Sequence, residues 1–430
     1  VILAQAYWLP NSSQHHILPT ADSLCNMAST RAFKSLYFFS SIAQMMLMRF
    51  ITTYFVHLGL GPIQIGILNA LRPAAAFAGE ITWAAIIDCG YSFRLTVLSC
   101  TSVAVALFAC IPLVTSFPAI VLLYSLSAFG LTWLGSRDAR IIATLKNQGY
   151  DDGEFGRIRK YAALGWGCSG LSSGHLATLL GQNAMFGLFV LAELAVMLIV
   201  AFAQMDEPPK KPKVGELRRV DSRVEVRQTI RSPWIALFLA NLLAYGFCAS
   251  AVETFLFVYL LQDFPTGSDT LVGTTLAAMT VTELPIFQYA DKILKLGYVN
   301  IFAMCHVVLA LKCVLYSLLP TANPWLVLAI EPLHGVAFAA MWVAAIDFVK
   351  QYVPKSCLTR FQGLASGLYF QLSFGLGSFV WATIMHSVGF RTGYCIVSGV
   401  ILLWSLMWNV AMRRATPFEP DELTEGILGA

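Results

Sequence analysis

Ionisable side chains stand inside long apolar stretches of this sequence, where a charge is costly and therefore points to function. The stretch AIEPLHGVAFAAMW, residues 329–342, places Glu331 and His334 three residues apart, with Pro332 between them. Residues at this spacing share one face of a helix and can interact. A carboxylate whose surroundings alternate between a cation and apolar groups can bind and release a proton, and an imidazole can relay it. The pair therefore predicts a proton-coupling site.

Further charges fall at a similar depth in other apolar stretches, if each helical residue rises about 1.5 Å. A guanidinium can bind a carboxylate or phosphate with two hydrogen bonds, so the arginines among them predict an anionic group on the solute. The same arginines could instead pair with acidic residues of other helices. The remaining candidates for proton coupling are Lys312, Glu283 and Glu253. The candidates for substrate binding are Arg49, Arg72, Glu193, Trp342 and Tyr369.

Prolines accompany three of these charges, in Arg72-Pro73, Glu283-Leu284-Pro285 and Glu331-Pro332. A proline inside a helix removes one hydrogen bond and frees a carbonyl one turn earlier. Broken backbone within a membrane is tolerated only where protein or a water-filled cavity receives it. The combination predicts a polar cavity, although each charge alone could equally belong to a buried ion pair that only fixes packing.

The composition indicates that much of the chain's surface faces membrane lipid. Of its 430 residues, 57% are hydrophobic and 12% are charged. A soluble domain carries about 25% charged residues, so the excess apolar surface must face membrane lipid. The net charge of +4 does not indicate nucleic-acid binding. The ten cysteines are scattered singly, and no zinc-binding spacing or GxSxG, HExxH or Walker motif is present, so we expect no enzyme, cofactor or metal site.

Apolar stretches long enough to cross a membrane predict an all-α integral membrane protein of about twelve transmembrane helices in two six-helix bundles. The expected spans are 34–58, 62–87, 94–114, 118–136, 160–180 and 184–204, then 233–262, 270–290, 298–318, 323–349, 361–385 and 390–412. A charged, Pro-rich segment separates the two sets. We therefore expect an N-terminal tail (1–29), a first bundle (30–205), a linker (206–231) with a short surface helix, a second bundle (232–414) and a C-terminal tail (415–430).

Lys and Arg set the expected orientation. Nearly all of them fall on one side of this arrangement, whereas the opposite loops HLGLGP, PLVTSFP, GQN and PTANP contain none, and Arg391 is the exception. Both termini and the linker are therefore expected in the cytosol. The first residues lack the basic start and cleavage site of a signal peptide, and Met27 is a natural start for the cytosolic edge.

Weak internal repetition relates the two halves. Asp138 and Asp347 each end a predicted span before a basic loop, and we expect them, with Asp88 and Arg94, to act in gating at the cytosolic edge. The helix that follows each loop carries a Gly-xxx-Gly spacing, which allows close helix approach. We expect these helices to form the surface on which the two bundles slide. The glycine pairs are Gly170 with Gly174 and Gly363 with Gly367.

Several stretches resemble the major facilitator superfamily. LGLGPIQIGILNALRP with ITWAAIIDCGYSFR looks like its second helix and following loop, and FGRIRKYAALGWG like the fifth helix of its lactose-permease-like branch. TELPIFQYADKILKLGY and WLVLAIEPLHGVAFAAMW are similar to the group around major facilitator superfamily domain-containing protein 6. The loop after the second helix departs from the family pattern, because Ala84 replaces a glycine, Cys89 follows Asp88, and only Arg94 remains of the basic cluster.

The resemblance implies the major facilitator fold and a secondary active transporter that moves a small polar solute by alternating access, with proton-coupled symport expected from the charges. Lactose permease has a similar trio of a cation, a His and a Glu, matched here in type and not in position. The alternative is a transporter-like receptor or scaffold without coupled transport. We expect a multi-pass monomer in the plasma membrane or an endomembrane, with a small-molecule solute, protons and lipid as its partners.

Overall fold

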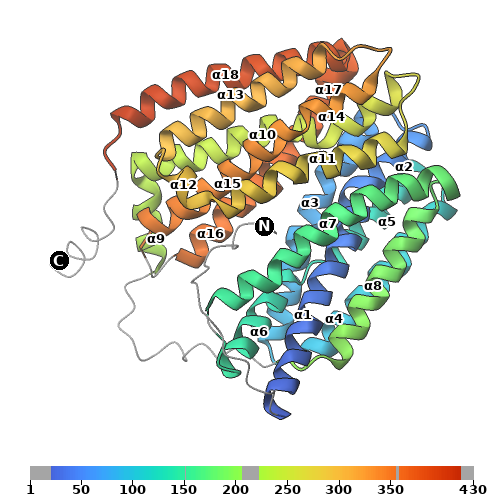
Figure 1. Ribbon diagram of the computed structural model, residues 1–430, viewed down its shortest axis with the longest axis vertical. Coiled ribbons are helices and arrows are strands. Elements are labelled where there is room, and N and C mark those ends of the chain that lie inside the picture. The colour runs from blue at the N-terminus through green and yellow to red at the C-terminus, as the bar shows by residue number, and fades with distance from the viewer. Residues whose placement is uncertain (1–20, 151, 206–221, 355–357, 418–430) are drawn as a thin grey trace.

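The computed structural model describes residues 21–150, 152–205, 222–354 and 358–417, and in these ranges the protein is helical without strands. Its helices form two groups, one from each half of the chain (Figure 1). The first group comprises α1 (Ala21–Met45), η1 (Met46–Phe50), α2 (Ile51–His57), α3 (Pro62–Asp88), α4 (Phe93–Ala109), η2 (Ile111–Leu113), α5 (Phe117–Gly130), α6 (Leu134–Asn147), α7 (Asp152–Leu180) and α8 (Ala184–Phe202).

The second half begins with α9 (Ser222–Arg231), which corresponds to the short helix expected in the linker, while residues 206–221 lie outside the described part. The second group of helices then comprises α10 (Pro233–Gln262), α11 (Asp269–Gln288), α12 (Ala290–Leu294), α13 (Tyr298–Ser317), η3 (Pro324–Leu326), α14 (Val327–Ile330), α15 (Pro332–Tyr352), α16 (Leu358–Ser366), η4 (Gly367–Ser373), α17 (Phe374–Val388) and α18 (Phe390–Arg414).

Helices occupy every predicted span, and nine stretches of the described chain are long and apolar enough to cross a membrane. The predicted spans 34–58, 62–87 and 160–180 are helical too, but are not among those nine. The predicted span 118–136 is interrupted, because α5 ends at Gly130 and α6 starts at Leu134. The protein is thus an all-α membrane protein with the two-bundle architecture.

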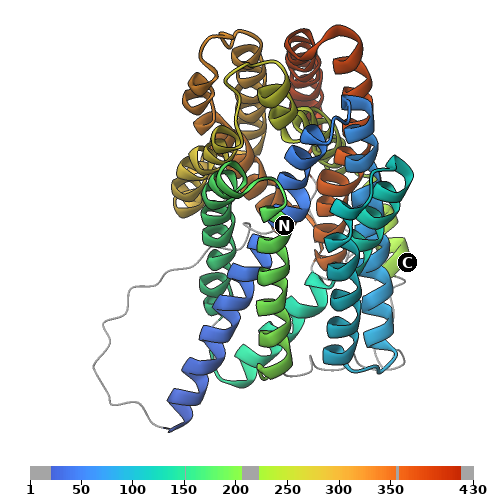
Figure 2. The same cartoon turned by 90° about the vertical axis from the view of Figure 1, so that its right-hand side faces the viewer.

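The two bundles meet along two helix pairs, α7 with α11 and α3 with α17. We call the end where α8 ends and α10 begins the linker end. In Figure 1 the bundles lie close together near α2 and α11 and spread apart toward α6 and α9, and the turned view in Figure 2 shows the same two groups of helices.

Glycines allow the close approach of α7 to α11. A Cβ added at Gly170 would lie 2.8 Å from the Cβ of Leu276, and one at Gly174 would overlap the backbone of Asp269. The expectation for the second half is wrong in detail, because a Cβ at Gly363 or Gly367 would meet no atom within 4 Å. On the α3–α17 pair the close contact is made instead by Gly66 against Ser378 and Ala382.

Backbone irregularities coincide with candidate site residues. Pro73 and Pro285 lie inside α3 and α11, whereas Pro332 starts α15 directly after an interruption at Glu331. Arg49 and Tyr369 lie in the π-helical segments η1 and η4. Such segments widen the helical turn and are frequent at functional sites.

Candidate functional site

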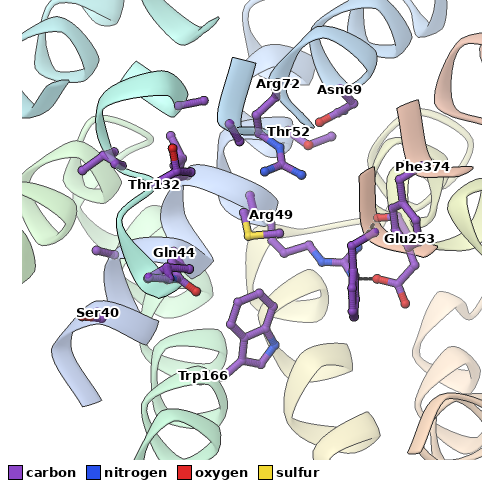
Figure 3. Close-up of a pocket in the computed structure, with 18 of the residues that line it drawn as sticks. Ser40, Gln44, Arg49, Thr52, Asn69, Arg72, Thr132, Trp166, Glu253 and Phe374 are labelled. Carbon is purple, nitrogen blue, oxygen red and sulfur yellow. Dashed lines mark hydrogen bonds and ion pairs between the residues drawn. The ribbon is translucent and has the colours of Figure 1, made fainter. Parts of the chain in front are cut away.

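A cavity of about 260 Å³ lies between the two bundles. Side chains from both halves line it, and Figure 3 shows Arg49 and Arg72 from the first bundle on the same cavity as Glu253 from the second. Its walls are largely apolar and aromatic, including Trp166, Phe370 and Phe374. Among the residues predicted from sequence, the lining includes Arg49, Arg72, Glu193, Glu253, Glu283, His334 and Tyr369.

An ion pair crosses the cavity. The guanidinium of Arg49 on η1 contacts the carboxylate of Glu253 on α10 and also donates to the backbone carbonyl of Glu253. The other carboxylate oxygen of Glu253 lies 2.8 Å from Nε2 of His334 on α15. Glu253 is 8% and His334 10% exposed in their side chains, so both contacts are largely shielded from solvent. This trio joins the two bundles through one carboxylate.

Glu331 does not line the cavity. Its side chain is fully buried within the second bundle, where Lys312 Nζ lies 3.1 Å from Oε2 and the Tyr316 hydroxyl donates to Oε1. The expected side-chain contact with His334 is therefore wrong, because Glu331 points toward α13 while His334 reaches α10. Sequence reasoning missed Tyr316, although it follows Lys312 by four residues and so shares its helical face.

Several polar atoms of the cavity wall have no hydrogen-bond partner within the described part of the chain. They are Asn69 Nδ2, Arg72 Nε, Glu193 Oε2 and Gln371 Oε1. Trp342 lies behind the wall, 2% exposed, with its ring 4.9 Å from that of Phe370, which does line the cavity. Trp342 therefore supports the aromatic wall without facing the cavity.

A polar cluster joins the bundles at the end opposite the linker. Gln182, in the turn between α7 and α8, donates a 2.5 Å hydrogen bond to Asp269 at the start of α11. His57 Nε2 lies 3.2 Å from each carboxylate oxygen of Asp269, and Thr53 donates to Gln182 at 3.3 Å. We call His57, Gln182 and Asp269 the latch. Sequence analysis did not select any of them.

The residues expected to act in gating contact their own bundles. Asp138 accepts hydrogen bonds from Tyr37 at 2.7 Å and Arg137 at 2.9 Å, and Asp347 accepts one from Tyr298 at 2.7 Å. Arg94 donates to the backbone carbonyl of Ala203 at 2.6 Å. The side chain of Asp88 lies outside the described part. Within the described residues, no His, Cys, Asp and Glu side chains form a group that could hold a metal ion.

Comparison with known proteins identifies the family to which this chain belongs. It is 21% identical over 379 residues to the uncharacterized transporter YwbF of Bacillus subtilis (strain 168), covering 87% of this chain and 90% of that protein. It is 25% identical over 355 residues to the maltose permease of Geobacillus stearothermophilus, covering 79% and 84%. The fold is similar to the crystal structure of the nucleoside transporter NupG, with a TM-score of 0.77 at 16% identity over 90% of this chain and 99% of that one. A family model matches residues 30–396, and the chain therefore belongs to the MFS_1 like family of membrane transporters.

Proposed function

We propose that this protein is a secondary active transporter that moves a small polar solute by alternating access, in symport with protons. The contact of Arg49 and His334 with Glu253, inside a cavity between the two bundles, carries the proposal. Protonation of Glu253 removes the charge that holds Arg49, and so weakens a contact that the two bundles share. A proton and a solute that meet between the bundles are thereby linked to the same movement.

The position of Glu253 makes it our first candidate for the coupling carboxylate. It lines the cavity and contacts groups from both bundles, as a group that senses their separation must. Glu283 also lines the cavity and is the second candidate. Glu331, with Lys312 and Tyr316, is fully buried between α13 and α15, and we assign this trio to holding those helices together.

The topology belongs to the same proposal. The excess of Lys and Arg in the loops at the linker end supports cytosolic termini and a linker over 206–231 between bundles at 30–205 and 232–414. Asp88, Arg94, Asp138 and Asp347 remain our candidates for gating at that end. The resemblances of 155–167, 282–298 and 325–342 support a place in the lactose-permease-like branch, near major facilitator superfamily domain-containing protein 6.

Proteoliposomes that contain a pH-sensitive dye test the function. The first solutes to offer are nucleosides and maltose, because the structural neighbour NupG is a nucleoside transporter and one relative is a maltose permease, followed by small organic acids. We expect one solute to drive proton entry and to accumulate only when a proton gradient is imposed. Glu253→Gln should abolish accumulation while solute exchange remains, whereas Asp291→Asn, at an exposed carboxylate, should change neither.

Two outcomes would count against this proposal. Solute binding without gradient-driven accumulation would favour a transporter-like receptor or scaffold. Accumulation that survives Glu253→Gln would remove Glu253 from the coupling mechanism, and Glu283→Gln would then be the variant to compare.

A further inference from the structure

Unpartnered polar atoms on the cavity wall show what kind of group a solute must present. Four such atoms lack a hydrogen-bond partner within the described chain: the donors Asn69 Nδ2 and Arg72 Nε, and the acceptors Glu193 Oε2 and Gln371 Oε1. Only the two donors come from the same helix, α3. A buried polar group without a hydrogen bond destabilises a protein, so a wall that retains such groups is suited to a ligand that bonds to them. Asn69 is 8% exposed, so its amide is well shielded from bulk water.

The two donors come from one helical turn of the first bundle. Asn69 and Arg72 are three residues apart on α3 and so lie on the same side of it, and Figure 3 shows both beside the cavity with Thr52 near them. A guanidinium and an amide N–H on the same helical turn can each donate a hydrogen bond to a carboxylate.

The charges of the wall select Arg72 over Arg49. The Arg49 guanidinium is already paired with Glu253 across the cavity. Within the described residues, no ion pair joins Arg72 to a carboxylate. Arg72 is the second arginine of the cavity lining, and its guanidinium is open to a solute. Arg72 offers one positive charge, so a second negative charge on the solute would lie in the largely apolar cavity without a partner.

The other lining residues and the cavity volume indicate the size and polarity of the rest of the solute. The aromatic side chains of Trp166, Phe370 and Phe374 line the cavity, and Leu47 and Met48 add aliphatic surface. The cavity volume of about 260 Å³ lies just below the range of about 300–1,000 Å³ typical of drug-sized ligands. The pocket thus suits a small molecule with an apolar body and a single polar head.

We propose, resting on the proposed transport function, that the solute is a small monocarboxylate with an aromatic or aliphatic body, and that Arg72 and Asn69 of α3 bind its carboxylate. In this arrangement Arg72 recognises the solute while the Arg49–Glu253 pair responds to the proton. The two arginines, alike in type and both on the cavity, therefore have different tasks.

Matched acids and amides test the charge requirement without any gradient. The purified protein in detergent is titrated with indole-3-acetate and its amide, and with phenylacetate and its amide, and binding is followed by the shift in unfolding temperature. Phenyl phosphate serves as the doubly charged comparison. We expect each acid to bind at least about tenfold more tightly than its amide, since a hydrogen bond to a charged group is stronger than a neutral one, and phenyl phosphate to bind more weakly than phenylacetate.

Variants locate the effect. Arg72→Gln should reduce the acid-to-amide ratio to about one, Arg72→Lys should retain part of it, and Arg413→Gln, which removes an exposed arginine at the end of α18, should leave it unchanged. Acids that fail to stabilise the protein, amides that bind as tightly as acids, or a preference that persists in Arg72→Gln would overturn the proposal. Acid preference without proton-driven accumulation would leave this site intact and overturn only the coupled transport.

Discussion

Replacing Asp269 with Asn should shift the protein toward conformations in which the bundles separate at the latch. Asp269 accepts a 2.5 Å hydrogen bond from Gln182 and lies 3.2 Å from His57, so one carboxylate of the second bundle holds two elements of the first. Asn keeps the shape of the side chain but loses its charge and one acceptor. The separated conformation makes none of these contacts, so the substitution weakens only the latched one.

The size of the shift follows from the environment of each contact. A hydrogen bond to a charged group contributes about 1.5–3 kcal/mol. The His57 side chain is 44% exposed, so solvent weakens its contact, whereas that of Asp269 is 10% exposed. We therefore expect a loss of about 1–2 kcal/mol from the latched conformation, which multiplies the ratio of separated to latched molecules by about 5 to 30.

Distances between spin labels measure this ratio. Labels at Leu113 in the first bundle and Thr266 in the second, both exposed, are placed on a background without native cysteines. Asp269→Asn should raise the fraction of molecules with a long label distance. Thr270→Val is the matched control, because Thr270, the next residue of α11, contacts Thr178 of α7 in the first bundle through a neutral 2.9 Å hydrogen bond and should shift the ratio much less.

A distance distribution that Asp269→Asn leaves unchanged would refute the assignment of the latch. Equal effects of Asp269→Asn and Thr270→Val would show that the charge of Asp269 contributes nothing specific. His57→Ala should fall between the two, because the hydrogen bond from Gln182 remains in that variant.

Two other predictions concern the second bundle and the sliding surface. Glu331→Gln should destabilise the protein by roughly 3–5 kcal/mol because it leaves Lys312 buried without a countercharge, and the double variant Lys312→Met/Glu331→Leu should recover most of this in thermal unfolding. A single variant as stable as the parent would contradict the assignment of Glu331 to packing. Gly170→Leu should slow transport in proteoliposomes whereas Gly367→Leu should not, since a side chain at Gly170 meets Leu276 of α11 and one at Gly367 meets open space. Equal transport rates would place the sliding surface elsewhere.

The depth of a charge along its helix could be predicted from the sequence, and the cavity lining shows which of these predictions are correct. Counting residues from the ends of apolar stretches placed seven charges in one layer of the membrane: Arg49, Arg72, Glu193, Glu253, Lys312, Glu331 and His334. Five of them line the same cavity, whereas Lys312 and Glu331 do not. Depth depends only on rise per residue, which is nearly constant in a helix. The helices themselves were equally predictable, because lipid leaves an isolated backbone no other way to satisfy its hydrogen bonds.

The partner of each charge could not be read in the same way, because it depends on how each helix is rotated. Sequence analysis assigned Lys312, Glu331 and His334 to one proton-coupling site, but Lys312 contacts Glu331 inside the second bundle whereas His334 contacts Glu253. Arg49 lies in a π-helical turn, which changes the direction of the Arg49 side chain. No residue pattern in MLMRF predicts this turn. The latch was missed for another reason. Gln182 lies in a loop without charge, and an Asp at the first residue of a helix is an ordinary helix-start residue.

The interruption at Pro332 explains how one short segment makes two separate side-chain contacts, Glu331 with Lys312 and His334 with Glu253. Proline fits the first position of a helix, so α15 can begin directly at Pro332 while Glu331 lies at the junction with α14. Thr282 of α11 donates a 2.7 Å hydrogen bond to the Pro332 carbonyl and so holds the start of α15 against α11. Gly335, one turn later, lets α15 lie against the backbone of α11, where any larger residue would collide with it. With the junction held in this way, Glu331 points into the second bundle toward Lys312, and His334 points toward Glu253 at the cavity. The proline thus separates a carboxylate buried within the second bundle from an imidazole that lines the cavity, although the two lie three residues apart.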